Sequence, residues 1–156
     1  MRSRGFTLIE LVVTLAILGL LAASAMPLAQ LVSQREKESE LRAALREVRQ
    51  AIDDYHTAAS SGHIKMQIGE SGYPPDLKSL YAGVEDTASE KKVQLYFLRR
   101  IPRDPFFPDS NVAAEESWGL RSYASAPEDP QPGDDVFDIY SLATGKGLNG
   151  IAYHDW

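Results

Sequence analysis

The residues of this 156-residue sequence that could carry out catalysis form no recognisable site. No nucleophile elbow, phosphate-binding glycine loop or dinucleotide-binding glycine motif is present. Asp134, Asp135 and Asp138 are close enough in sequence for two carboxylates to share acid–base work. A solvated loop between two strands explains these aspartates more simply. The histidines stand in separate regions without metal-ligand spacing: His56, His63 and His154. The sequence therefore predicts that the protein is not an enzyme.

One short segment near the N-terminus has residue types and spacing that predict chemistry performed on the chain itself. Gly5 is followed by Phe6, and a carboxylate, Glu10, comes four residues after that phenylalanine. Glu10 is the one ionisable residue in an apolar run that extends from Phe6 to Val32. A carboxylate in a hydrocarbon setting costs about 2.5 kcal/mol or more, so its presence there predicts a function.

The apolar run predicts a membrane-spanning helix over 6–32. As a helix, its 27 residues would be about 40 Å long, enough to cross a hydrocarbon core of about 30 Å. Arg2 and Arg4 precede the run, which places the N-terminus in the cytoplasm by the positive-inside rule. Two plainer interpretations are a cleaved secretory signal, with its small-residue site at 22–25, and an uncleaved anchor that acts as a single copy. Both are disfavoured, because the run continues past 22–25 and a simple anchor would gain by losing Glu10.

The segment 4–11, Arg-Gly-Phe-Thr-Leu-Ile-Glu-Leu, resembles the processing motif of type IV pilins and type II secretion pseudopilins. The resemblance implies that a prepilin peptidase cuts between Gly5 and Phe6 and methylates the new amine of Phe6, so the apolar run is retained. It also implies that Glu10 acts in assembly, where its carboxylate would neutralise the amine of a neighbouring subunit. Pro27 is a further similarity. A proline inside the apolar helix removes one hydrogen bond, and we expect a kink or local melting there.

Beyond the apolar run, the sequence predicts that the helix continues as an amphipathic stem over 33–61. Apolar residues recur at spacings of four, three, four and three, which makes one stripe along a helix, and residues 60–62 end it. This stripe needs a covering partner. Arg42, Arg46 and Arg49 share another side of the helix, and acidic neighbours favour a solvated or subunit-contact face over a DNA-binding patch. The stripe consists of Leu41, Leu45, Val48, Ile52 and Tyr55.

Residues 62–156 are predicted to form a globular head with a small antiparallel sheet. When the sheet covers the stripe of the stem, the result is an α+β fold. Residues 72–80 indicate a turn and a short helix with proline in its first turn. Residues 107–118 form an acidic loop that contains proline, and 127–135 a polar hairpin loop. Three segments bounded by turn-forming residues are the strand candidates: 119–126, 135–142 and 151–156.

The head resembles the major secretion pseudopilins in three places: segment 97–106, segment 137–142 and the terminal Trp156. That family holds a calcium ion in the loop that follows the second of these segments, with aspartates as ligands. Here the corresponding loop 143–150 has no carboxylate and contains Lys146. This is a poor ligand set for a cation that needs about six to eight oxygens. We therefore predict no metal and no other cofactor, with packing in place of calcium.

The charge balance and the absence of cysteine limit the class of partner. Lys and Arg number 16 against 22 Asp and Glu, a net charge of −6, which argues against sequence-independent binding of nucleic acid. The absence of cysteine excludes a disulfide scaffold and thiolate metal sites. Removal of Arg2 and Arg4 with the leader leaves 14 basic against 22 acidic side chains, so the side-chain charge becomes −8.

Together the motif, the apolar run and the head predict a pseudopilin, a structural subunit of a periplasmic type II secretion filament that supports protein export. The predicted organisation is a leader (1–5), a transmembrane and filament-core helix (6–32), a stem (33–61) and a periplasmic head (62–156). The resemblance implies a single-pass protein of the bacterial inner membrane with a cytoplasmic N-terminus. It implies as partners prepilin peptidase, other copies of the chain, minor pseudopilins, an inner-membrane assembly platform and, before assembly, membrane lipid. The alternative is a minor pilin-like binding module whose head captures DNA, a substrate or a surface.

Overall fold

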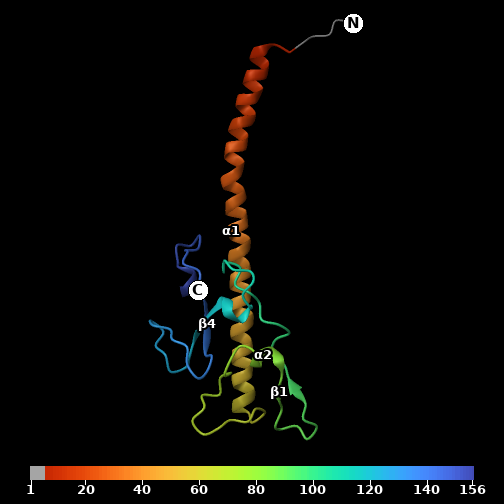
Figure 1. Cartoon of the computed structure of the whole chain (residues 1–156), viewed down its shortest axis with the longest axis vertical. Coiled ribbons are helices and arrows are strands. Elements are labelled where there is room, and N and C mark those ends of the chain that lie inside the picture. Colours follow the sequence, from red (N-terminus) through yellow and green to blue (C-terminus); the bar gives the residue numbers. More distant parts are fainter. Residues whose placement is uncertain (1–5) are drawn as a thin grey trace. The chain divides into compact units, whose positions relative to one another are not determined.

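The computed structural model describes residues 6–156, except for the side chains of residues 23–27. Its chain forms two compact units, Met1–Lys37 and Glu38–Trp156, and helix α1 (Leu8–Ser60, 53 residues) contributes to both (Figure 1). The long N-terminal helix that the sequence predicts is therefore confirmed.

The end of α1 is fixed by backbone hydrogen bonds that only a left-handed residue allows. Gly62 has φ +81° and donates to the carbonyl of Ala59 at 3.1 Å, and the N–H of His63 reaches the carbonyl of Ala58 at 2.9 Å. This pair of bonds is a Schellman motif, which satisfies carbonyls left open at a helix C-terminus. The predicted end of the stem at residues 60–62 is thus correct.

The C-terminal unit adds short elements around its part of α1. Helix α2 (Ser79–Ala82) precedes a hairpin of β1 (Val84–Glu85) and β2 (Gln94–Leu95), and β3 (Trp118–Arg121) pairs antiparallel with β4 (Asp138–Ser141). In the second sheet Trp118 lies opposite Ser141 and Arg121 opposite Asp138. Two short 3-10 turns complete the unit, η1 (Glu115–Ser117) and η2 (Tyr153–Asp155). This arrangement confirms the predicted α+β class.

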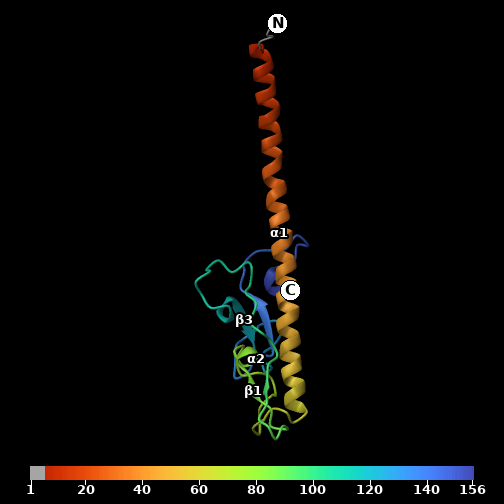
Figure 2. The ribbon, with the colours of Figure 1, turned by 90° about the vertical axis from the view of Figure 1, so that its right-hand side faces the viewer.

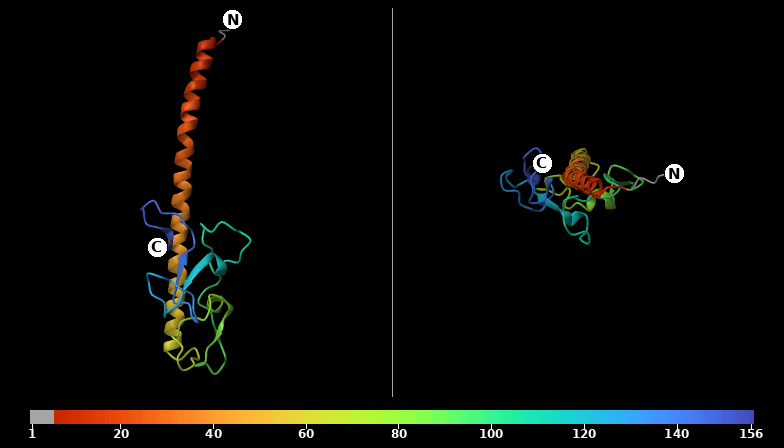
Figure 3. Two further views of the ribbon diagram at one scale, coloured as in Figure 1. Left: turned by 60° about the vertical axis from the view of Figure 1, so that its left-hand side comes forward. Right: turned by 90° about the horizontal axis from the view of Figure 1, so that it is seen from above.

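The elements of the C-terminal unit surround one part of the helix. In Figure 2, β3, α2 and β1 all lie on one side of the C-terminal half of α1. Figure 3 shows that the loop before β3 and the C-terminal segment, coloured teal and blue, flank that half of the helix on opposite sides. The sheet is too small to cover the helix alone, so loops complete the cover.

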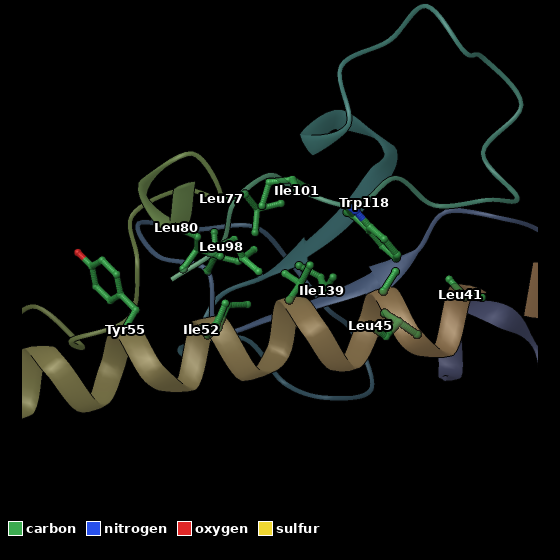
Figure 4. Close-up of a cluster of buried hydrophobic side chains, with 14 of the residues drawn as sticks. Leu41, Leu45, Ile52, Tyr55, Leu77, Leu80, Leu98, Ile101, Trp118 and Ile139 are labelled. Atoms are coloured by element: carbon green, nitrogen blue, oxygen red, sulfur yellow. The ribbon is translucent and has the colours of Figure 1, made fainter. Parts of the chain in front are cut away.

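The predicted stripe is the centre of the core. All five of its residues are buried, with at most 7% of their surface exposed. Figure 4 shows the side chains of Leu41, Leu45, Ile52 and Tyr55 between α1 and the elements of the C-terminal unit. Burying one side chain of this size contributes about 1.5–3 kcal/mol, so the stripe is a major source of stability for the unit. Its principal partners are Leu77, Leu80, Leu98, Ile101, Trp118, Val136 and Ile139.

The predicted third strand, 151–156, is wrong. Its first part makes one isolated bridge, between Lys146 and Ala152, and its second part is the 3-10 turn η2. A turn with about three residues per repeat places Tyr153 and Trp156 on one side, and their rings lie 5.1 Å apart between centroids. A strand would alternate the faces of successive residues and separate these two rings.

The other predicted elements are correct in kind but not in extent. The strands occupy Trp118–Arg121 and Asp138–Ser141, shorter than the predicted 119–126 and 135–142. The short helix begins only at Ser79, after both prolines, so the prediction of proline in its first turn is wrong. Pro74 is buried and its carbonyl accepts the N–H of Val136 at 2.8 Å, which holds this segment outside the helix. The hairpin of β1 and β2 was not predicted.

Candidate processing and assembly site

The predicted processing motif lies where α1 begins. Gly5 is outside the described residues, so the predicted cleavage position is not tested. Phe6 is described, precedes the helix and has 78% of its surface exposed. The first helical residue is Leu8. Phe6, the residue that follows the proposed cut, is therefore outside the helix and exposed.

Glu10 has hydrogen-bond partners within its own chain. Its carboxylate oxygen Oε2 accepts the backbone N–H of Thr7 at 2.9 Å and the hydroxyl of Thr7 at 2.8 Å, while the N–H of Glu10 donates to that hydroxyl at 3.3 Å. This reciprocal arrangement is a capping box, with Thr7 as the N-cap and Glu10 three residues later. The spacing Thr-x-x-Glu is visible in the sequence and could have predicted this capping box. Glu10 was predicted only to pair with the amine of a neighbouring subunit.

The described part of the N-terminal unit exposes large apolar side chains around the whole helix. Soluble monomers rarely expose a continuous apolar surface of this extent, so this surface requires an apolar environment or a partner. The part of the chain that the structure describes, which omits the side chains of residues 23–27, contains no helix long and apolar enough to cross a membrane. The exposed side chains include Leu8, Ile9, Leu11, Leu15, Leu18, Leu20, Leu21, Leu28 and Leu31.

The backbone of α1 is helical through Pro27, so the structure has no local melting at this residue. The side chain of Pro27 lies outside the described part of the chain. Whether the helix bends there stays a prediction.

The basic face of the stem is used within the chain. The guanidinium of Arg49 donates to Asp138 Oδ1 at 2.7 Å, to the carbonyl of Ile139 at 3.1 Å and to the terminal oxygen of Trp156 at 2.9 Å. The guanidinium of Arg42 lies 4.1 Å from the centre of the Trp156 ring, a cation–π distance. Two of the three predicted basic residues thus hold the head, while Arg46 is exposed.

The carboxylates considered for acid–base work have separate structural partners. Asp138 binds Arg49, whereas Asp135 accepts the hydroxyl of Ser71 and, at 2.8 Å, the N–H of Tyr123. An acid–base pair would need these carboxylates to face one substrate. Asp134 and Asp135 line one open hollow, but Asp138 is bound to Arg49 instead and Asp135 is used by Ser71 and Tyr123.

The histidines are also apart. The ring of His56 stacks on Tyr73 at 4.3 Å, while the Nδ1 atoms of His63 and His154 lie 3.0 Å and 3.1 Å from the carboxylates of Asp86 and Asp155. Among the described residues, no three or more acidic, histidine or cysteine side chains are grouped as metal ligands.

A buried carboxylate that the sequence analysis missed is Asp104, which is 1% exposed. It accepts the hydroxyl of Ser141 at 2.6 Å and the N–H of Phe106 at 2.8 Å, and its own N–H donates to the hydroxyl of Ser117 at 3.1 Å. These bonds join the segment 97–106 to β4. The two stretches that resemble the major pseudopilins are thus bonded to each other.

The loop 143–150 does not fit a calcium ion. The carboxylate of Glu38 reaches this loop, and its Oε1 atom accepts the N–H of Leu148 at 2.8 Å and the hydroxyl of Tyr153 at 3.2 Å. Those hydrogen-bond donors occupy the oxygen that a cation would use. Calcium requires about six to eight oxygen ligands, and the structure offers no cluster of carboxylates in its described part.

The sequence of this chain is similar to known proteins at its N-terminus and over most of its length. A family model described as "Prokaryotic N-terminal methylation motif" matches residues 1–26. The chain is 29% identical to "Type II secretion system core protein G" of Klebsiella pneumoniae over 142 residues, 86% of this chain and 93% of that protein. It is 26% identical to the protein of the same name from Dickeya chrysanthemi over 154 residues, 96% of this chain and 94% of the relative.

A third relative of this name, from Pectobacterium carotovorum, is 28% identical over 143 residues, 86% of this chain and 83% of the relative. No solved structure matches the chain significantly. The resemblance predicted from the N-terminal motif and the head is confirmed by these similarities, which extend over most of both chains. They do not favour the alternative of a minor pilin-like binding module.

Proposed function

We propose that this chain, a relative of the type II secretion core protein G, is a pseudopilin: a non-catalytic structural subunit of a filament that supports protein export. One observation carries the proposal. A methylation motif at residues 1–26 is joined to a chain that resembles core protein G over most of its length. A secretory signal or a simple anchor would need only the N-terminal part of this similarity.

Processing is the first step of the proposed function. Prepilin peptidase cleaves between Gly5 and Phe6 and methylates the amine of Phe6. The capping box supports this role, because α1 begins at Leu8 and its cap, Thr7, remains after the cut. The shortened chain therefore keeps the start of its helix.

Before assembly the chain is anchored in the inner membrane, with Arg2 and Arg4 in the cytoplasm and the head in the periplasm. The exposed apolar side chains of residues 6–22 and 28–32 support this placement, because lipid and then neighbouring helices would cover them. The partners are the assembly platform, other copies of this chain and minor pseudopilins. Subunits in one repeating orientation form an open filament through head-to-tail contacts.

The two sets of Glu10 partners belong to two states. In the single chain the carboxylate is satisfied by Thr7. In the filament it pairs with the methylated amine of Phe6 in a neighbouring subunit, which removes the cost of two unpaired charges in an apolar medium.

The decisive experiment is expression of the full chain with and without prepilin peptidase, followed by mass spectrometry of the intact protein. We expect loss of residues 1–5 and one added methyl group only when the peptidase is present. An unchanged N-terminus in both samples, or cleavage after Ala25, would contradict the proposal.

Assembly is tested separately with Glu10→Ala. Because an unpaired charge costs about 2.5 kcal/mol or more in hydrocarbon, we expect filament recovery to fall by about tenfold or more, while cleavage stays near normal. Glu36→Gln is the matched control, since Glu36 is an exposed carboxylate on the same helix. Sheared filaments are quantified by immunoblot. Equal recovery from both variants would show that Glu10 has no assembly role.

A further inference from the structure

We propose that loop 143–150 is held closed by side chains of α1 and by the chain's own C-terminal residue, so the head folds fully without calcium. We call Glu38, Arg42, Arg49 and Trp156 the C-terminal clasp. This inference goes beyond the filament role and does not depend on it, because it concerns the folding of the C-terminal unit alone.

Glu38 forms the first contact of the C-terminal clasp. The residue is 3% exposed although its helical neighbours are exposed. Its Oε1 atom accepts the N–H of Leu148 and the hydroxyl of Tyr153, and its Oε2 atom lies 3.7 Å from the Nη2 atom of Arg42. A buried carboxylate is costly unless it is paired and hydrogen-bonded, so these contacts are required for Glu38 to lie there. Hydrogen bonds to an ionised acceptor are also among the stronger ones in proteins. Glu38 therefore holds the loop by accepting two of its hydrogen-bond donors, without a metal ion between them.

The loop itself closes through bonds between its own backbone groups. The N–H of Gly147 donates to the carbonyl of Ile151 at 2.8 Å, and the N–H of Tyr153 donates to the carbonyl of Gly145 at 3.1 Å. The side-chain oxygen of Asn149 accepts the N–H of Ile151 at 3.1 Å. Oxygen atoms that could have faced a cation are thus used inside the loop.

The ring of Trp156 packs against the loop at Gly147. A Cβ atom at Gly147 would lie 2.2 Å from the Trp156 ring, so only glycine permits this approach. The ring packs edge-on against Tyr153 and lies below Arg42, while the terminal oxygen binds Arg49. The last residue of the chain is therefore fixed to α1 at two points.

The chemistry of the surrounding groups opposes a cation. Arg42 and Arg49 are positively charged, and Lys146 lies in the loop. Guanidinium and ammonium groups are donors without an acceptor atom, so they cannot ligate a metal and they repel one.

The first test asks whether calcium matters. The full chain in detergent micelles is unfolded by heat with millimolar calcium chloride or with the chelator EGTA. Hydrogen exchange of residues 143–156 is followed by mass spectrometry under both conditions. We expect the same thermal unfolding midpoint, and the same protection of residues 143–156 from exchange, with calcium and with EGTA. A midpoint several degrees higher with calcium, or protection that depends on calcium, would overturn the proposal.

The second test asks whether Glu38 holds the loop. In Glu38→Ala we expect exchange across 143–156 to accelerate by about tenfold or more, because loss of a buried charged acceptor opens the loop locally. Glu40→Ala is the matched control, since Glu40 lies two residues away on α1 and is exposed. Equal exchange in the two variants would defeat the proposal.

A third variant covers the case in which Glu38→Ala does not fold. Trp156→Leu leaves Glu38 in place but removes the ring that contacts Gly147, Tyr153 and Arg42. We expect faster exchange in 143–156 and unchanged exchange in β3. Unchanged exchange in 143–156 would show that the terminal residue does not hold the loop.

Discussion

Asp104 shows how a single buried group can determine the arrangement of several segments. It lies in the sequence Pro102-Arg103-Asp104-Pro105, where a charged residue between prolines would ordinarily be exposed in a loop. Its carboxylate instead binds Ser141 of β4, and the nearby Trp118 ring nitrogen donates to the carbonyl of Pro102 at 2.8 Å. This segment is thereby fixed to both strands of the second sheet.

Replacing Asp104 by alanine should destabilise the C-terminal unit by about 3 kcal/mol, because the donors of Ser141 and Phe106 would remain buried without an acceptor. Chemical denaturation followed by tryptophan fluorescence measures the change. Asp109→Ala is the control, since Asp109 is an exposed carboxylate in the same part of the chain. Similar midpoints for the two variants would contradict this role.

The hydrogen bond between Tyr81 and Glu115 predicts a dependence of stability on pH. The hydroxyl of Tyr81 lowers the pKa of Glu115 below its ordinary 4.5, and the same bond raises the pKa of Tyr81 above 10.0. The lowered pKa stabilises the fold above pH 4.5, and this contribution is lost as the pH falls through the folded value. The raised pKa stabilises the fold below pH 10.0, and this contribution is lost as the pH rises.

Tyr81→Phe should therefore lessen the fall in folding stability at acid pH. It should also remove part of the fall in folding stability at alkaline pH. Burial also raises the pKa of Tyr55 and Tyr73, so some alkaline loss should remain. Thermal midpoints across the pH range give the two limbs, with Tyr96→Phe at an exposed tyrosine as the control. An acid limb that is the same in both variants would disprove the link.

At the scale of the element, the stem shows what periodicity determines and what it does not. The spacing of Leu41, Leu45, Val48, Ile52 and Tyr55 was enough to predict the buried face, and the turn-forming residues 60–62 predicted the end of α1. The segment 151–156 contains strand-forming residues, but contacts distant in sequence decide its structure. Tyr153 stacks on Phe106 at 4.2 Å, and Trp156 is bound by Arg49. Local propensity contains no information about such partners, and tertiary contacts override it.

Ile52→Ala should remove about 2–5 kcal/mol from the stability of the C-terminal unit. Ile52 is fully buried and packs among the strands and loops that cover the stripe, so the cavity would have little room to collapse. Urea denaturation measures the loss. Arg46→Ala is the control, because Arg46 is exposed on the same helix. A loss no larger than that of Arg46→Ala would contradict the importance of the stripe.

At the scale of the whole molecule, the chain divides its apolar residues between two uses. The unit Glu38–Trp156 has a core of its own, whereas the described apolar residues of Met1–Lys37 are exposed. The N-terminal motif and the stripe made both uses predictable. The partners of Glu38 and Asp104 were harder to predict, because both lie in segments more than thirty residues away along the chain.

A fragment that starts at Ser33 should therefore fold as a soluble monomer, since it loses the exposed apolar surface and keeps the core. Size-exclusion chromatography and circular dichroism test this expectation, with the full chain in detergent as the reference. An aggregated fragment, or one without a cooperative unfolding transition, would show that the N-terminal unit is needed for folding.

The bond between Arg49 and the backbone oxygen of Trp156 also sets an order in time, because it joins residues 107 positions apart. A contact between such distant residues closes a long loop, and the entropy of that closure is lost before the contact stabilises the chain. The attachment of the C-terminal segment to α1 should therefore be a late step of folding, after the local turns of the helix have formed.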